Sequence, residues 1–117
     1  MTNIEILVKA NQAFSSGNYE ELLTYCTEDT KWTYIGDSTL DGKENVYKFL
    51  LSAYADTTFG IEKYVEDGET IITIGRIKLM NKDGKLTDSP FCDVWKFRNG
   101  KMSQLIRSFA SENWFDK

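Results

Sequence analysis

The sequence predicts an α+β fold, in which three N-terminal helices pack on a curved antiparallel sheet and enclose an apolar pocket. Apolar residues in the first half recur at helical spacing, which indicates amphipathic helices. In the second half, three Asp-Gly or Asn-Gly dipeptides are flanked by β-branched and aromatic runs, a pattern typical of hairpins. The length of 117 residues is that of one ordinary domain, so residues 1–117 are expected to fold as a single unit.

The first half is expected to form three helices and one short strand. Thr2 or Asn3 can cap the first helix, and the polar run at residues 15–18 ends it. Residues 19–26 predict a short second helix, and residues 42–56 a third. Residues 31–35 predict a strand between these two helices. The expected inner faces of the first and third helices consist of Ile4, Leu7, Val8, Phe14, Val46, Phe49, Leu50 and Ala53.

The second half is expected to form a four-strand meander over residues 59–111. Its turns are marked by Asp67-Gly68, Asp83-Gly84 and Asn99-Gly100. Strands this long must curl in order to pack, with Gly75 as a candidate bend and Pro90 as a candidate bulge. Helices can cover only part of so curved a sheet, and the remaining concave space is where a pocket is expected.

Composition excludes several classes of function. A net charge of −4 and a pI near 4.8 argue against nucleic-acid binding and against an anionic membrane surface. No stretch is long and apolar enough for a transmembrane helix, and the N-terminus does not resemble a signal peptide. Two distant cysteines, Cys26 and Cys92, indicate free thiols in a reducing cytoplasm. Because the chain has no histidine, Ser-His-Asp or Cys-His nucleophiles and His-ligated metals are excluded, and neither a metal site nor a cofactor is expected.

Four segments carry a resemblance to a known family. They are residues 14–22 (FSSGNYEEL), 27–32 (TEDTKW), 40–46 (LDGKENV) and 91–102 (FCDVWKFRNGKM). In these segments the chain resembles the nuclear-transport-factor-like superfamily, in its SnoaL-like and ketosteroid-isomerase-like branch. The resemblance implies a cone-shaped α+β fold and covers isomerases, cyclases, dehydratases, epoxide hydrolases and members that only bind or dimerise.

The same resemblance places functional residues one by one. Asp93 falls where ketosteroid isomerases keep a protonated acid that donates a hydrogen bond to the oxyanion. Their general-base aspartate falls on Tyr34, and their oxyanion tyrosine falls on Ala10. Many SnoaL-like proteins carry His at the position of Asp93 and an acid near Ala110, and this chain has neither. Steroid isomerisation by that mechanism is therefore not expected.

Hairpin register predicts which side chains share a face with Asp93. A two-residue turn at Asp83-Gly84 would place Ile74 opposite Asp93, with Arg76 diagonal to it. For the last hairpin, a two-residue turn would place Ile106 opposite Asp93, and a three-residue turn Leu105. The resemblance favours the second register, which we adopt. The expected pocket face is Trp32, Tyr34, Ile74, Arg76, Phe91, Asp93, Trp95, Leu105, Arg107 and Phe109.

Two functions follow from this pocket, both with a small hydrophobic or carbonyl-containing molecule as partner. In one, Asp93 acts as an acid or base near neutral pH while Tyr34 and Arg107 polarise a carbonyl, as in an isomerase, cyclase or dehydratase. In the other, Asp93 is held in an ion-pair cluster by Arg76 and Arg107, and the domain only binds or dimerises. The outer sheet face is expected to carry Cys92, Val94, Met102 and Ile106, which predicts a homodimer through that face.

Overall fold

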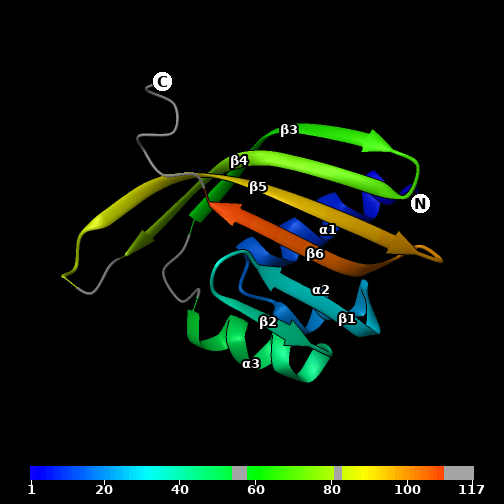
Figure 1. Ribbon diagram of the computed structural model, residues 1–117, viewed down its shortest axis with the longest axis horizontal. Helices are drawn as coiled ribbons and strands as arrows, with labels where there is room; N and C mark the ends of the chain where they lie inside the picture. The colour runs from blue at the N-terminus through cyan, green and yellow to red at the C-terminus, as the bar shows by residue number, and fades with distance from the viewer. Residues whose placement is uncertain (54–57, 81–82, 110–117) are drawn as a thin grey trace.

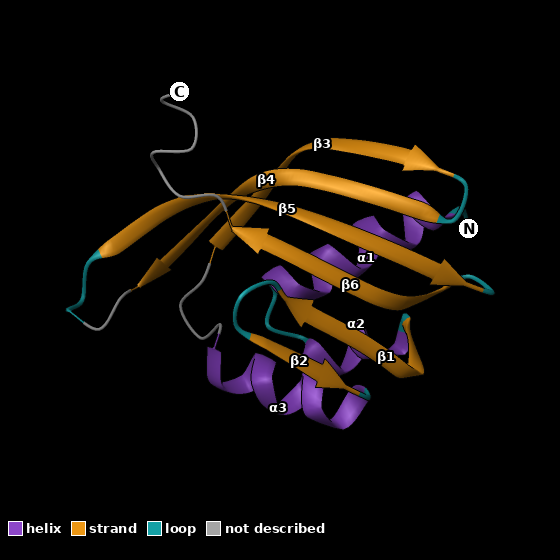
Figure 2. Ribbon diagram, viewed as in Figure 1, coloured by secondary structure: helices purple, strands orange, loops and turns teal. Residues whose placement is uncertain are grey.

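The computed structural model describes residues 1–53, 58–80 and 83–109, and it has the predicted α+β architecture (Figure 1). Three helices lie on one face of a curved, unclosed six-strand sheet (Figure 2). The helices are α1 (Asn3–Ser15), α2 (Tyr19–Thr24) and α3 (Lys43–Ala53). The strands are β1 (Cys26–Tyr34), β2 (Ser38–Asp41), β3 (Thr58–Asp67), β4 (Thr70–Met80), β5 (Leu86–Arg98) and β6 (Lys101–Phe109). Within the described ranges, no helix is long and apolar enough to cross a bilayer.

The helices begin and end where local chemistry predicts. Thr2 caps α1 in a reciprocal capping box: the Glu5 amide donates to Thr2 Oγ1 at 3.2 Å, and the Thr2 amide donates to Glu5 Oε1 at 3.1 Å. The Asn18 side chain caps α2 by accepting from the Glu21 amide at 3.1 Å. The buried face of α1 differs from the predicted stripe, because Ile4 and Val8 are only partly covered. The buried residues of α1 are Ile6, Leu7, Ala10 and Ala13.

The four-strand meander is confirmed, and its neighbours in the sheet come from the N-terminal half. The strand order is β2-β1-β6-β5-β4-β3. β1 is longer than the predicted strand, and β2, which pairs antiparallel with it, was missed. β1 pairs in parallel with β6, so that Trp32 lies beside Leu105 and Tyr34 beside Arg107. This pairing places a strand from the N-terminal half beside the last strand of the described chain.

The predicted register between β4 and β5 is wrong by one residue. Thr73, rather than Ile74, lies opposite Asp93. The reason is the length of the connection: the last pair is Met80 with Leu86, so the loop is longer than a two-residue Asp83-Gly84 turn. A slip of one residue exchanges the faces of a strand. Ile74, 39% exposed, and Arg76 therefore lie on the outer face, and the prediction that they share the face of Asp93 is wrong.

The last hairpin follows neither predicted register, although it keeps the predicted face for β6. A two-residue turn at Asn99-Gly100, both with positive φ, pairs Arg98 with Lys101. A bulge then leaves Ser103 unpaired between Met102 and Gln104, and its hydroxyl donates to the Lys96 carbonyl at 3.1 Å.

That bulge decides which β6 side chains point inward. Arg107 lies opposite Asp93 and points inward, as does Leu105. Met102 was expected on the outer face and is instead fully buried, because the bulge puts it on the same face as Leu105. The predicted bulge at Pro90 is not observed, since the β4–β5 pairing continues through it without a shift.

The sheet curves where β3 and β4 pass each other most closely. A Cβ placed on Gly75 would lie 2.1 Å from the Gly60 carbonyl oxygen and 3.0 Å from the Phe91 ring, so only glycine fits there. β3 also carries a bulge between Ile61 and Lys63. The glycine and the bulge together accommodate the curvature that lets the sheet wrap around the helices.

Candidate functional site

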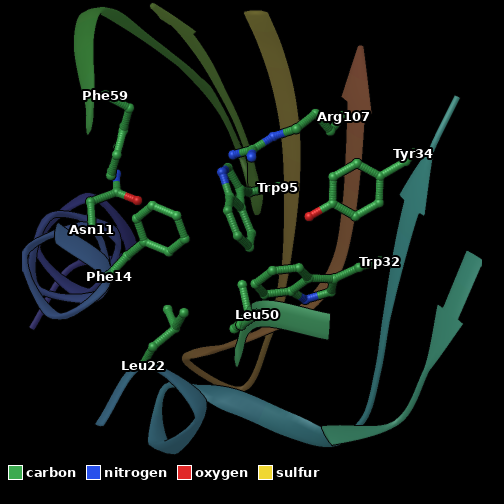
Figure 3. Close-up of a pocket in the computed structure, with 9 residues that line it drawn as sticks. All are labelled: Asn11, Phe14, Leu22, Trp32, Tyr34, Leu50, Phe59, Trp95 and Arg107. Atoms are coloured by element: carbon green, nitrogen blue, oxygen red, sulfur yellow. The ribbon is translucent and has the colours of Figure 1, made fainter. Parts of the chain in front are cut away.

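A cavity lies between the three helices and the inner face of the sheet (Figure 3). Its volume is about 20 Å³, which is room for roughly one water molecule. The walls come from both layers of the fold and are mostly aromatic or aliphatic. The lining residues are Asn11, Phe14, Leu22, Trp32, Tyr34, Leu50, Phe59, Trp95 and Arg107.

Arg107 and Asp93 form a bidentate ion pair beside this cavity. Arg107 Nε donates to Asp93 Oδ1 at 2.7 Å, and Arg107 Nη2 donates to Asp93 Oδ2 at 2.6 Å. The side chains are 10% and 2% exposed, respectively, so the pair is shielded from water. The direct cross-strand pairing of the two residues fixes this geometry. Both carboxylate oxygens of Asp93 are therefore occupied by the guanidinium.

Aromatic rings surround the guanidinium. Arg107 Cζ lies 5.2 Å from the centroid of the Phe91 ring and 5.9 Å from that of Tyr34, within the range of cation–π attraction. Trp32 and Trp95 meet edge to face at 5.5 Å and form the adjoining wall. Arg107 is thus an ion-paired guanidinium held among aromatic rings at the cavity wall.

Two residues that line the cavity carry a buried donor for which the described residues supply no acceptor. Asn11 Nδ2 and Trp32 Nε1 both belong to cavity-lining residues and have no hydrogen-bond partner. A buried donor without a partner is costly, so such groups in a native structure call for an explanation. In Figure 3 the Tyr34 hydroxyl and the Arg107 guanidinium extend from one wall, and Asn11 lies on the opposite wall. The polar lining therefore combines the Arg107 guanidinium, which only donates, with the Asn11 amide and the Tyr34 hydroxyl, which can donate and accept.

The structure brings together four of the predicted pocket residues as cavity lining: Trp32, Tyr34, Trp95 and Arg107. Asp93 does not line the cavity, although Arg107, which it holds, does. Phe91 packs under the guanidinium, and Leu105 is fully buried in the core. The backbone of Phe109 pairs with Phe91, and its side chain lies outside the described residues. Ile74 and Arg76 are on the other face; Arg76 Nε donates to Asp88 Oδ1 at 3.0 Å.

Sequence reasoning missed the helical side of the cavity. Phe14, Leu22 and Leu50 were assigned to apolar helix faces, but not to a pocket. Asn11 carried a signal that was overlooked: it lies four residues after Leu7 and three before Phe14, so it is a polar residue on a stripe that packs inward. Among the described residues, no group of three His, Cys, Asp or Glu side chains is placed to hold a metal ion.

Comparison with known proteins identifies the family. A family model described as a SnoaL-like domain matches residues 7–105. The chain belongs to the SnoaL-like family. The resemblance predicted from its sequence segments is thereby confirmed. No curated protein sequence matches this SnoaL-like chain.

Solved structures support the same fold for this SnoaL-like domain. An NTF2-like protein of unknown function from Burkholderia pseudomallei superimposes with a TM-score of 0.87 at 20% identity, over 99% of this chain and 97% of that chain. TerC, co-crystallised with polyporic acid, superimposes with a TM-score of 0.86 at 18% identity, over 97% of this chain and 95% of that chain. Bal32a, from a soil-derived mobile gene cassette, superimposes with a TM-score of 0.85 at 20% identity, over 93% of this chain and 89% of that chain. At these identities the likeness concerns the fold alone.

Proposed function

We propose that this SnoaL-like domain binds a small, largely apolar molecule bearing a carboxylate or carbonyl oxygen, and that Arg107 holds that oxygen. The observation that carries the proposal is a buried arginine in the wall of an aromatic cavity. The Tyr34 hydroxyl, which extends from the same wall as Arg107 in Figure 3, can donate to the same oxygen. TerC was co-crystallised with an acid, polyporic acid, which supports an acidic ligand class for a pocket of this fold.

In this proposal Asp93 is a positioning residue, and the domain binds its ligand without using Asp93 as an acid or base. Both of its oxygens accept hydrogen bonds from Arg107, and it does not line the cavity. A proton transfer at Asp93 would first have to break a buried bidentate pair, which is costly. The geometry therefore favours the ion-pair alternative over a proton-transferring isomerase, cyclase or dehydratase. In contrast to the sequence-based expectation, Arg107 rather than Arg76 pairs with Asp93, since Arg76 lies on the other face and pairs with Asp88.

Ligand titration monitored by tryptophan fluorescence tests this function, because Trp32 and Trp95 line the cavity. The probes are polyporic acid and a matched pair consisting of an aromatic carboxylic acid and its amide. We expect the acid to bind more tightly than the amide. The double variant Asp93→Asn/Arg107→Gln, which removes both charges together, should weaken binding of the acid by tenfold or more, because a charge-assisted hydrogen bond is lost.

The matched control is Arg98→Gln, because Arg98 pairs with Asp29 at the surface and does not line the cavity. It should bind the acid as the wild type does. Equal affinity of the wild type and the double variant for the acid would overturn the role of Arg107. If neither polyporic acid nor the aromatic acid binds, the proposed ligand class is wrong.

We further propose that two copies associate through the outer sheet face. An apolar row crosses four strands there, since Val65, Ile72, Val94 and Ile106 are successive cross-strand neighbours. Val65 is 40% exposed, and within the described chain all three helices lie on the opposite face (Figure 2). A contiguous apolar surface of this kind is typical of an interface.

Sedimentation velocity at micromolar concentration tests the dimer. Ile74→Glu, at the partly exposed neighbour of this row, should shift the protein to the monomer, whereas Lys96→Glu, at an exposed position further along β5, should leave it dimeric. A monomeric wild type would contradict the proposal.

The two free cysteines, Cys26 and Cys92, support a reducing compartment such as the cytoplasm.

A further inference from the structure

A surface groove runs between α1 and β3, next to the cavity. Its volume is about 450 Å³, far larger than that of the cavity. Its strand side is apolar and aromatic, with Phe59, Ile61 and Tyr64. Its helix side offers amide and hydroxyl groups along successive turns of α1. The helix residues that line it are Val8, Asn11, Gln12, Ser15 and Ser16.

Phe59 separates this groove from the cavity. Phe59 and Asn11 line both spaces, so the two are neighbours across these side chains. The Phe59 ring is held edge-on by Phe14 at 5.0 Å and, more loosely, by Phe91 at 6.4 Å. In Figure 3, Phe59, Asn11 and Phe14 form the wall opposite Arg107. A rotation of the Phe59 side chain would join the two spaces into one.

Size requires such a connection if Arg107 is to hold an organic ligand. The cavity has room for roughly one water molecule, whereas sites for small organic molecules usually measure about 300–1,000 Å³. Only the oxygen-bearing end of a ligand fits at Arg107, so the rest of the molecule must extend beyond Phe59. A second surface hollow of about 360 Å³ also adjoins Phe59, but it is lined by Arg76, Lys78 and Asp88 and so does not suit an apolar body.

The local structure permits Phe59 to move. Phe59 is only partly buried and lies on β3, an edge strand of the sheet. Gly60 follows it, and a Cβ on Gly60 would have no atom within 4 Å, so the outer face of β3 next to Phe59 is open. Edge elements with few buried contacts open at the lowest cost in free energy.

We infer that the ligand is an elongated amphiphile that spans the cavity and the α1–β3 groove, and that Phe59 is the residue that determines which molecules enter. This inference rests on the proposed function. The acidic or carbonyl end of the ligand lies at Arg107, and an apolar, preferably planar middle part passes Phe59. The far end lies in the groove, with Ile61 and Tyr64 on one side and the hydrogen-bonding groups of α1 on the other. A short acid extends from Arg107 only to the part of the groove beside Phe59, and a long acid continues to Ile61 and Tyr64.

A length series of aromatic acids tests the inference: benzoic acid, biphenyl-4-carboxylic acid and p-terphenyl-4-carboxylic acid, titrated by calorimetry. We expect affinity to rise along the series in the wild type. Ile61→Ala and Tyr64→Ala should weaken binding of the two longer acids by about tenfold and leave the affinity for benzoic acid unchanged, because only the longer acids reach Ile61 and Tyr64. Leu51→Ala, at an exposed position of α3 that lines neither the cavity nor the groove, is the matched control and should leave the affinity for all three acids unchanged.

Phe59 is tested by the rate of association. Phe59→Ala removes the side chain that separates the groove from the cavity and should raise the association rate of the longer acids. Phe59→Leu, which keeps most of the packing, should raise that rate less. If the long acids bind in an Arg107-dependent way but Ile61→Ala and Tyr64→Ala have no effect, the groove assignment is wrong and the proposed function stands. If binding of every acid is independent of Arg107, the proposed function fails and this inference fails with it.

Discussion

Removing one partner of the Asp93–Arg107 pair should lower the free energy of unfolding far more than replacing both partners together. Arg107→Met would leave the Asp93 carboxylate, 2% exposed, without its two charge-assisted hydrogen bonds. Loss of one partner of a buried pair costs about 3–5 kcal/mol. That is a large share of the roughly 6–18 kcal/mol expected for a domain of this length. At about 4 °C for each kcal/mol, the melting temperature should fall by about 12–20 °C.

The double variant Asp93→Leu/Arg107→Met is the informative comparison. It replaces both charges by apolar side chains among the aromatic neighbours of the pair, and such replacements are often neutral or stabilising. We therefore expect the double variant to be more stable than either single variant, with a coupling free energy above about 2 kcal/mol. Urea unfolding followed by circular dichroism measures all four members of the cycle.

A small effect in the single variants would refute this reasoning. If Arg107→Met and Asp93→Leu each cost less than about 1 kcal/mol, the value typical of exposed pairs, the ion pair does not hold Asp93 in the core. Asp93 would then be accessible, and proton-transfer chemistry with enolisable ketones would become the function to test, with loss of turnover in Asp93→Asn as its signature.

Three further predictions concern the scaffold. Gly75→Ala, whose Cβ would meet a backbone oxygen, should lower the free energy of unfolding by about 3 kcal/mol, whereas Gly60→Ala, in open space, should cost nothing measurable by urea unfolding. Burial raises the pKa of Cys26 to about 12, so iodoacetamide at pH 8 should label Cys92 well before Cys26. Mass spectrometry of the labelled protein over time measures this order. Thr2→Ala removes the α1 cap and should cost about 1 kcal/mol in thermal unfolding; no loss would contradict the capping role.

Most of the architecture could be predicted from the sequence because its signals are local. Helical periodicity, the cap at Thr2 and the paired turn residues each act within a few positions, and they were sufficient for the helices and the meander. β2 was missed because Ser38–Asp41 is short and has no apolar alternation of its own. It is stabilised by pairing with β1, which is a tertiary contact.

The candidate site was harder to predict because it depends on register. Placing Asp93 and Arg107 on one face was possible because the family resemblance favoured that register, whereas the turn rules alone left both faces of β6 open. Their direct pairing depends on the bulge at Ser103, and the exclusion of Ile74 and Arg76 depends on the length of one loop. Neither feature has a strong sequence signal, and each shifts every side chain of a strand together.

The parallel pairing of β1 with β6 also sets the order in which the molecule can fold. β6 is the last strand in the described sequence, yet it lies between β1 and β5 in the sheet. Until β6 is inserted, β1 and β5 have unpaired edges and Tyr34 has no neighbour at the position of Arg107. Closing so long a loop is entropically slow, so the chain should fold slowly for its size. The same segment that completes the sheet supplies Arg107, so every chain that has finished folding also has an assembled pocket.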